Sequence, residues 1–354
     1  MTTDTEANQA GPPAGAVPDP KDVASLVQYI FGALSAHTLG AAARLGVVET
    51  IGDGVATVEE VAAGCATDRE ATLRLLRAMA GLGLVEETTL FKVTPAGQML
   101  DSSRPGSLSS LAKAFTEPSM VRSLESLDDA VRTGEAVFPK VFGQDYFDYL
   151  EKQPEEAASF NAAMGESSAA TAAMVAEGFD FGGFGTVVDL GGGDGTLLAA
   201  VLQRYPEVRG VVQDLPGALV QTPQNMRDAG VQERFTAAPD DFFVSIAEGD
   251  LYVLKGVLHN WDDEHCLKLL RNVRESVPEK GRLLIVENVL PPHVAPELVG
   301  SYLNDLNMLV NFGGKERTAA DFAALLRQAD FAHPVVEQLP AFGVSLIHAA
   351  PAPQ

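Results

Sequence analysis

Short apolar runs alternate with longer segments of helical period over the second half of the chain. The first run, residues 186–190, reads Thr-Val-Val-Asp-Leu and leads through four glycines into a helical pattern. Strands that alternate with helices form doubly wound, mostly parallel sheets, because each crossover helix packs on a face of the sheet. We therefore predict an α/β, Rossmann-like domain with a mostly parallel seven-stranded sheet, with strands expected at 186–190, 210–213, 234–237, 251–254, 282–286, 335–339 and 344–348.

The segment 23–45 has the period of a helix but is apolar on nearly every face. A helix of this kind must be covered by other apolar groups. The cover can come from the rest of the chain or from a second copy of it. The pattern favours an interface between two copies, and we expect a homodimer.

A helix, helix, hairpin pattern follows this segment. Thr57 is positioned to cap a first helix, Asp68 to cap a second that runs to Met79, and residues 84–93 alternate as a hairpin. This order is typical of a winged helix. Because the residues around its arginines are acidic, we interpret it as a dimerisation module and do not expect DNA binding.

The helical pattern then continues from 108 to 178. Phe160 and Met164 lie four residues apart and share one helix face, which belongs either to an interdomain core or to a substrate cavity. We expect four regions: a disordered tail (1–20), a winged-helix-like dimerisation domain (21–105), a helical linker and substrate-cavity region (106–180) and a nucleotide-binding domain (181–354).

The charge of the chain limits the classes of partner that it can bind. Its 354 residues carry a formal net charge of -23, and nucleic acids and anionic membranes both require a cationic face. Its two cysteines, Cys65 and Cys266, lack the spacing of a metal site, so we expect free thiols and no metal. Residues 1–20 lack the features of a signal peptide and no segment is apolar enough to span a membrane, so we expect a cytoplasmic protein.

The glycine-rich turn after the first strand predicts a nucleotide site. Gly191 and Gly193 allow the backbone to approach a ligand at a helix N-terminus. The dinucleotide fingerprint is not matched, because Thr196 stands where its third glycine would be. Asp189 at the end of the strand favours a ligand with an amine or a cation, since it would repel a pyrophosphate. This disfavours a nicotinamide-dependent dehydrogenase.

Polar residues follow the other strands at the same edge of the predicted sheet, where ligands bind in such folds. Asp214 ends the second strand and is placed to accept hydrogen bonds from ribose hydroxyls. The others are Asp241 after the third strand, Lys255 and His259 after the fourth, and Glu287 at the end of the fifth.

Six motifs carry a family resemblance: VVDLGGGDGT, QDLP, DDFF, LKGVLHNWDDEHCLKLLRN, IVENVLP and GGKERT. In this order and spacing they resemble the caffeate-type small-molecule O-methyltransferases, over nearly the whole chain. The resemblance implies S-adenosylmethionine as cofactor, S-adenosylhomocysteine as product, and a small aromatic acceptor from natural-product or antibiotic biosynthesis. It also implies that the winged helix is a dimerisation domain.

The resemblance implies a role for individual residues. His259 matches the family's general base, and Glu287 and Glu316 match the acidic residues that flank it. The implied cofactor-binding residues are Ser168, Asp189, Gly191, Gly193, Asp214, Leu215, Asp241, Phe242 and Lys255. The positions near the acceptor are Phe160, Met164, Asn260, Asp305 and Met308. Two residues depart from the family pattern. Plant members usually have Asp where this chain has Asn260, and Thr is common where this chain has Asp194.

The residue types suit methylation of a phenol, which is mostly un-ionised at neutral pH and needs a base. Two alternatives remain. Some relatives from aromatic polyketide pathways support decarboxylation or hydroxylation with the cofactor bound, but the intact His259, Glu287 and Glu316 favour methylation. A regulator that uses the winged helix would have to bind DNA, which the acidic charge disfavours.

Overall fold

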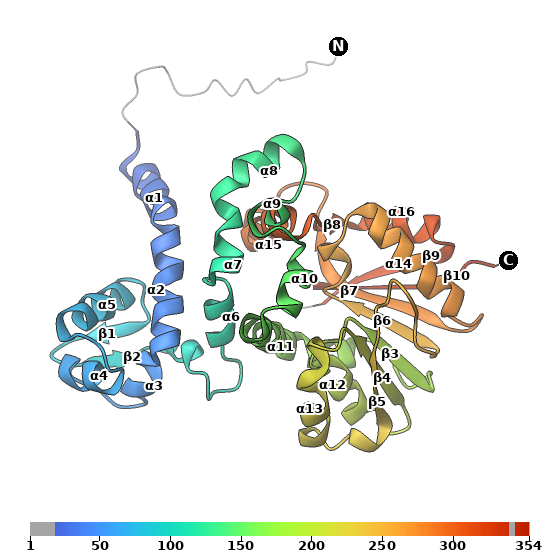
Figure 1. Cartoon of the computed structure of the whole chain (residues 1–354), viewed down its shortest axis with the longest axis horizontal. Helices are drawn as coiled ribbons and strands as arrows, with labels where there is room; N and C mark the ends of the chain where they lie inside the picture. Colours follow the sequence, from blue (N-terminus) through green and yellow to red (C-terminus); the bar gives the residue numbers. More distant parts are fainter. Residues whose placement is uncertain (1–17, 340–343, 354) are drawn as a thin grey trace, which may run out of the picture.

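The computed structural model of the chain describes residues 18–339 and 344–353, so most of the tail predicted as disordered lies outside the described residues. Figure 1 shows a small N-terminal part (blue) beside a larger α/β part (yellow to red), with a group of green helices between them. From the N-terminus to the C-terminus, the chain passes through these three parts in this order.

The predicted helix over 23–45 is two helices, α1 (Pro20–Ile30) and α2 (Gly32–Leu45), which meet at an angle of 48°. The prediction of one helix was wrong because the helix breaks at Phe31, next to Gly32, a weak helix former. Large apolar side chains of α1 remain exposed. Among the described residues no single helix is long and apolar enough to cross a membrane, although α1 and α2 pass that test together as a bent pair.

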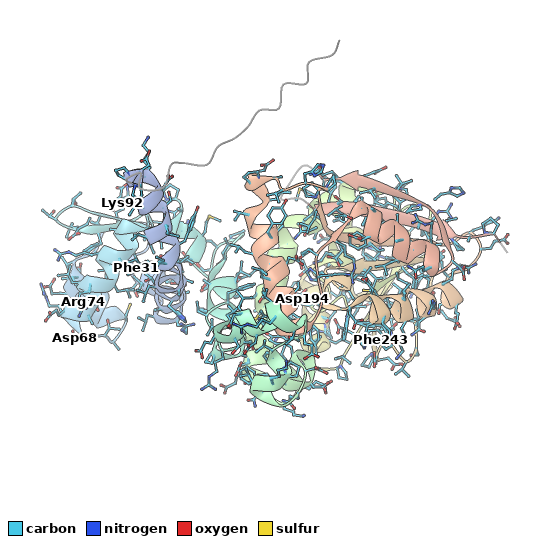
Figure 2. The ribbon with its side chains drawn as sticks, turned by 90° about the horizontal axis from the view of Figure 1, so that it is seen from above. Phe31, Asp68, Arg74, Lys92, Asp194 and Phe243 are labelled. Carbon is cyan, nitrogen blue, oxygen red and sulfur yellow. The ribbon has the colours of Figure 1, made fainter. Side chains whose placement is uncertain are left out.

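The winged-helix pattern is present as predicted. Thr57 and Glu60 form a capping box at the start of one helix, and Asp68 accepts a hydrogen bond from the backbone of the next. Arg69 pairs with Glu59, and Arg77 pairs with Glu87, so carboxylates already neutralise two of the arginines of this domain. Figure 2 shows Arg74 and Lys92 on the N-terminal part, away from Asp194. The elements are α3 (Val47–Ile51), α4 (Val58–Gly64), α5 (Arg69–Gly81), β1 (Val85–Glu87) and β2 (Phe91–Val93).

Six helices connect the two parts. Glu166 on the longest of them accepts hydrogen bonds from the backbone N–H and the hydroxyl of Ser110, and so caps the first. Met120, Phe138, Tyr146 and Leu150 form a small separate core. The helices are α6 (Ser109–Ala114), α7 (Pro118–Val121), α8 (Leu127–Thr133), α9 (Phe138–Phe142), α10 (Tyr146–Glu151) and α11 (Pro154–Gly178).

All seven predicted strands are present, in the order β5-β4-β3-β6-β7-β10-β9, and a two-residue eighth strand pairs with β7. Neighbours from β5 to β7 are parallel, and β10 is antiparallel to both β7 and β9. The mostly parallel fold class is therefore confirmed. The strands are β3 (Thr186–Leu190), β4 (Arg209–Asp214), β5 (Phe235–Pro239), β6 (Leu251–Lys255), β7 (Arg282–Leu290), β8 (Arg317–Thr318), β9 (Phe331–Gln338) and β10 (Val344–Pro351).

The prediction that Glu287 ends the fifth strand was wrong. β7 continues to Leu290, because Asn288 pairs with β10 and Val289 pairs with β8. Glu287 therefore lies inside a strand that has neighbours on both sides.

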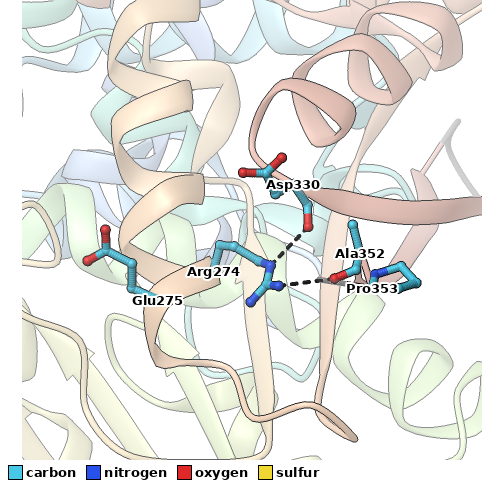
Figure 3. Close-up of a pocket in the computed structure, with 5 residues that line it drawn as sticks. All are labelled: Arg274, Glu275, Asp330, Ala352 and Pro353. Atoms are coloured by element: carbon cyan, nitrogen blue, oxygen red, sulfur yellow. Dashed lines mark hydrogen bonds between the residues drawn. The ribbon is translucent and has the colours of Figure 1, made fainter.

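Helices cover both faces of the sheet. One core contains side chains of α11 and α12, and the other contains side chains of α14 and α16. Arg274 on α14 donates to the backbone carbonyls of Asp330 and Ala352, which ties the chain after β10 to this layer (Figure 3). The helices are α12 (Thr196–Arg204), α13 (Thr222–Asp228), α14 (Asp263–Ser276), α15 (Val299–Asn307) and α16 (Ala319–Gln328).

Candidate active site

The glycine loop between β3 and α12 has a backbone shape that favours glycine. Gly191, Gly193 and Gly195 have φ of 69°, 54° and 79°, in the left-handed region. A Cβ on Gly191 would lie 2.8 Å from Val257 Cγ2, and one on Gly192 would lie 2.7 Å from Asp189 Cγ. The loop thus packs its backbone against Asp189 in β3 and against Val257, which follows β6, a contact that the sequence did not predict.

Asp189 lies under this loop and is 2% exposed. Its Oδ2 is buried and has no hydrogen-bond partner among the described residues. Burial raises the pKa of Asp189 to about 7, although the charge of Lys255 opposes the shift. A buried carboxylate oxygen without a partner is costly, so this position favours a ligand that brings a cation or a donor.

Asp214 at the end of β4 fixes the loop from the other side. Its Oδ2 accepts from the Gly193 N–H at 2.9 Å, and its Oδ1 accepts from the Leu215 N–H at 2.7 Å. Burial raises the pKa of Asp214, and these two donors oppose the rise. Each oxygen still has a free lone pair, so the carboxylate can bind hydroxyls while it orders the loop.

Lys255 at the end of β6 connects the sheet to α11. Its Nζ donates to Ser168 Oγ at 2.7 Å, which brings together two residues 87 positions apart. Burial lowers the pKa of Lys255, while the nearby carboxylates of Asp189 and Glu287 act in the opposite direction.

Asp241 and Phe242 follow β5 at the same edge. Asp241 Oδ1 accepts from the Phe243 N–H at 2.7 Å. The rings of Phe242 and Phe243 lie 4.9 Å apart, and Phe243 meets Trp261 edge-on at 4.8 Å. These contacts form an aromatic wall beside the glycine loop.

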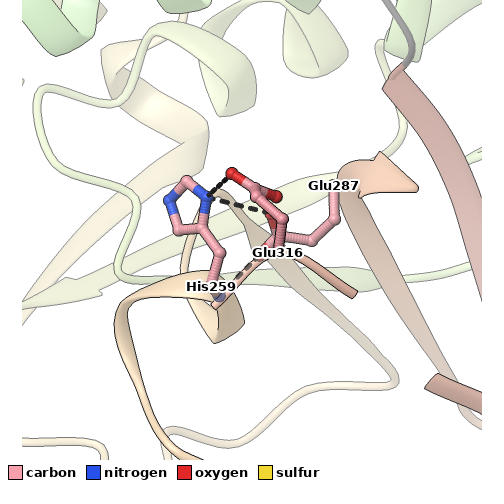
Figure 4. Close-up of side chains that lie close together, drawn as sticks. All are labelled: His259, Glu287 and Glu316. Carbon is pink, nitrogen blue, oxygen red and sulfur yellow. Dashed lines mark hydrogen bonds and ion pairs between the residues drawn. The ribbon is translucent and has the colours of Figure 1, made fainter. Parts of the chain in front are cut away.

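His259, Glu287 and Glu316 meet as predicted (Figure 4). Nδ1 of His259 lies 3.1 Å from Glu316 Oε1 and 3.6 Å from Glu287 Oε2. Both carboxylate side chains are 1% exposed, whereas the imidazole is 20% exposed. Nε2, on the other side of the ring, makes no hydrogen bond to the described residues. The ring is thus held at one nitrogen and free at the other.

The two carboxylates set the basicity of His259. Burial alone lowers the pKa of His259, but Glu287 and Glu316 outweigh burial and raise it to about 9. Glu287 also orders the backbone, because its Oε1 accepts from the N–H groups of Val257 and His259 at 3.0 and 3.3 Å. In the neutral ring, which predominates only above about pH 9, Nε2 is therefore a strong base in a fixed position.

Arg317, a residue to which sequence reasoning gave no role, holds the turn that carries His259. Its side chain is fully buried and donates to the carbonyls of Leu258 and Trp261, each at 2.8 Å, and to Asp263 Oδ1 at 2.7 Å. Gly314 lies against the same turn, since a Cβ there would lie 2.0 Å from the His259 carbonyl oxygen. The sequence signal for Arg317 was its place in the GGKERT motif, next to Glu316.

The residues predicted near the acceptor come from four elements. Phe160 on α11 meets Tyr146 edge-on at 5.4 Å, and Met164 lies one turn further along and is half-buried. Asn260 donates to the Gly256 carbonyl at 3.2 Å. Asp305 Oδ1 accepts from the Glu316 N–H at 2.7 Å, so this carboxylate also orders the site. Met308 is buried.

The chain matches two family models. One, described as the O-methyltransferase dimerisation domain, covers residues 27–103, and the other, described as the O-methyltransferase domain, covers residues 124–332. The chain is 42% identical to O-demethylpuromycin-O-methyltransferase of Streptomyces alboniger, over 92% of this chain and 88% of that protein. It is 38% identical to phenazine O-methyltransferase PhzM of Lysobacter antibioticus, over 96% and 98%.

The comparison with solved structures gives the same result as the comparison with sequences. The crystal structure of LaPhzM aligns with a TM-score of 0.88 and 37% identity, over 95% of this chain and 100% of that chain. Human N-acetylserotonin methyltransferase in complex with SAM aligns with a TM-score of 0.87 and 29% identity, over 96% and 100%.

The glycine loop fits S-adenosylmethionine, the cofactor of this family. Asp189 offers an unpaired buried oxygen to a ligand that carries positive charge, and Asp214 offers free lone pairs to hydroxyls. The resemblance noted from the sequence motifs is confirmed. The chain therefore belongs to the family of S-adenosylmethionine-dependent O-methyltransferases, with an N-terminal dimerisation domain and a C-terminal catalytic domain.

Proposed function

We propose that the enzyme methylates a phenolic hydroxyl of a hydrophobic aromatic small molecule, with His259 as the general base. The observation that supports this most strongly is the state of the imidazole. Nδ1 is held by two buried carboxylates, and Nε2 makes no hydrogen bond to the described residues, so the neutral ring can accept a proton there. The relatives described above are named methyltransferases, so decarboxylation or hydroxylation is not favoured.

When bound, S-adenosylmethionine would supply a methyl group on a positively charged sulfonium, and transfer of that methyl group to the acceptor oxygen would break its bond to sulfur and leave S-adenosylhomocysteine. A phenol has a pKa near that of tyrosine, about 10, so it is a poor nucleophile until it loses its proton. Nε2 of His259 takes this proton as the O–C bond forms. Glu287 and Glu316 then stabilise the imidazolium through Nδ1, and base help of this kind is typically worth about 10² to 10⁴ in rate.

The surroundings of the site favour an aromatic acceptor. Tyr146 lies 4.7 Å from Phe312 and 5.4 Å from Phe160, and Phe147 stacks on Trp261 at 5.9 Å, measured between ring centroids. Planar ligands pack well against aromatic rings that are partly exposed, as Phe160, Trp261 and Phe312 are. The relative named for phenazine, a planar aromatic molecule, is consistent with this class.

Transfer of a labelled methyl group tests the proposal. The enzyme is incubated with methyl-labelled S-adenosylmethionine and a panel of hydroxylated phenazines and phenols, and the products are identified by mass spectrometry. We expect label on a hydroxyl oxygen, and none on the parent compounds that lack a hydroxyl. Tight binding of S-adenosylhomocysteine without transfer to any hydroxyl would contradict the proposal.

The geometry at Nδ1 predicts the titration of His259. We expect NMR of the histidine rings in the free enzyme to give a pKa near 9, and a clearly lower value in Glu316→Gln, because that variant removes one of the negative charges that stabilise the imidazolium. Since the folded pKa is above the usual 6.5, this ion pair contributes stability below about pH 6.5 and loses it as the pH rises towards 9. An equal pKa in both proteins would contradict the assignment.

We propose that α1 and α2 form the core of a homodimer. Their exposed apolar side chains include Leu26 (62%), Ile30 (69%) and Leu34 (63%). Patches of this kind mark interaction surfaces. We expect light scattering to give the mass of a dimer for the wild type and that of a monomer for Ile30→Glu. Val220→Glu, at an equally exposed position of the catalytic domain, should stay dimeric. A monomeric wild type at micromolar concentration would contradict the proposal.

A further inference from the structure

Helix α15 and the π-helix Met308–Phe312 that follows it bury asparagines and expose apolar side chains. Leu303 is 61% exposed and Val299 is 57% exposed, whereas Asn307 and Asn311 are 9% and 1% exposed. This reverses the usual arrangement of a helix on a protein surface. Buried amides are costly unless they are hydrogen-bonded, so the inward asparagines need a specific reason.

These amides bond to one another in a chain that ends on the catalytic cluster. Asn311 Nδ2 donates to Asn307 Oδ1 at 2.8 Å, Asn307 Nδ2 donates to Asn304 Oδ1 at 3.4 Å, and Asn304 Nδ2 donates to Glu316 Oε1 at 2.7 Å. The helix passes into a π-helix at Met308–Phe312, so Asn311 lies on a wider turn that still faces Asn307. We call these three residues the asparagine ladder.

The carboxylate of Glu316 fixes the direction of the ladder. An ionised carboxylate only accepts hydrogen bonds, so Asn304 must present its NH₂ group to Glu316 and its oxygen to Asn307. The same logic then orients Asn307 and Asn311 in turn. A ladder of this polarity fixes one oxygen of Glu316 in space.

That oxygen is the one that bonds to the catalytic histidine. Glu316 Oε1 accepts from Asn304 at 2.7 Å and lies 3.1 Å from Nδ1 of His259, whereas Glu316 Oε2 is buried without a partner among the described residues. Without the ladder, no hydrogen bond from the side chains of α15 would hold Oε1 against the imidazole. Oε2 could then take its place, or neither oxygen could face the ring. The backbone of Glu316 is held separately, by Asp305.

We infer that Asn304, Asn307 and Asn311 are positioning residues that hold Glu316 Oε1 against Nδ1 of His259. This inference rests on the proposed function of His259 as the base. The ladder acts through Glu316 and touches neither the proton that is removed nor the methyl group. Its expected effect is therefore on the basicity and orientation of His259.

The test measures the pKa of His259 by NMR in the free enzyme, together with kcat and KM for an accepted phenol. In Asn304→Leu, which keeps the size of the side chain but removes the donor, we expect the pKa of His259 to fall by about one pH unit or more, towards 6.5. We expect kcat measured above the pKa of His259, where the ring is neutral in both proteins, to fall by about tenfold, with an unchanged KM for the acceptor. Asn307→Leu should give a smaller change of the same sign.

Two comparisons separate positioning from a structural role. Tyr302→Phe changes another polar side chain of the same helix, which accepts from the Ala295 N–H, and should leave both readouts unchanged. In the Glu316→Gln background, Asn304→Leu should cause no further fall in the pKa of His259. Asn304 is half-exposed, so its variant is expected to fold even if Asn307→Leu does not.

An unchanged pKa of His259 in Asn304→Leu would overturn the inference, as would an equal fall in the Glu316→Gln background. Loss of thermal stability without a change of pKa would assign the ladder to structure alone and would also overturn it. The proposed function fails separately, by full methyl transfer in His259→Ala. The NMR measurement needs no turnover, so the two failures are distinguishable.

Discussion

Replacement of His259 by alanine is expected to slow methyl transfer to a phenolic acceptor by about 10² to 10⁴ and to leave cofactor affinity unchanged. The imidazole supplies the only free basic nitrogen of the His259, Glu287 and Glu316 cluster, because Nδ1 is engaged by the carboxylates. The residues predicted to bind the cofactor lie around the glycine loop, and none of them is altered. Initial rates of labelled methyl transfer and calorimetry with S-adenosylhomocysteine measure the two effects.

His293→Ala is the matched control, since His293 is exposed. It should behave as the wild type in both assays. Turnover by His259→Ala at the wild-type rate would exclude His259 as the base. A parallel loss of cofactor affinity would instead indicate that the variant has disturbed the turn held by Arg317 and Gly314.

Replacement of Asp214 by alanine is expected to weaken S-adenosylmethionine binding by about tenfold to a hundredfold. Hydrogen bonds to a charged group contribute about 1.5 to 3 kcal/mol, and each 1.4 kcal/mol changes a dissociation constant about tenfold. The variant removes the acceptor proposed for the ribose hydroxyls and also the two bonds that order the backbone at Gly193 and Leu215. Isothermal titration calorimetry measures the dissociation constant directly.

Asp214→Asn is the matched variant for this experiment. Its amide oxygen can replace one of the two carboxylate oxygens that accept from backbone N–H groups, so we expect an affinity between those of the wild type and Asp214→Ala. Equal affinity of all three proteins would show that the ribose is held elsewhere. Circular dichroism of each variant checks that the domain is folded.

The sequence predicted those parts of the site whose signals are local. The strand at 186–190 and its glycine loop were correct because apolar runs and glycines act over a few residues. Asp214, Lys255 and His259 lie at the predicted edge because parallel strands bring their ends together. The division of the chain at residues 20, 105 and 180 stays a prediction.

The features that the sequence did not predict depend on contacts between residues that are distant in the chain. Arg317 donates to a carbonyl 59 positions away, and Asn304 acts on Glu316 through the packing of α15. β7 extends past Glu287 because β8 and β10 pair with it, which no local pattern reveals. The break at Phe31 was missed because the apolar pattern continues across it, although Gly32 was a signal for it.

The most direct test of the account compares wild type and His259→Ala on a series of phenols of different pKa. If His259 removes the acceptor's proton, the ratio of the two rates should be large for phenols with a pKa near 10 and should approach one for phenols already ionised at the assay pH. A ratio that stays the same across the series would contradict a base role for His259 and would assign its effect to orientation alone.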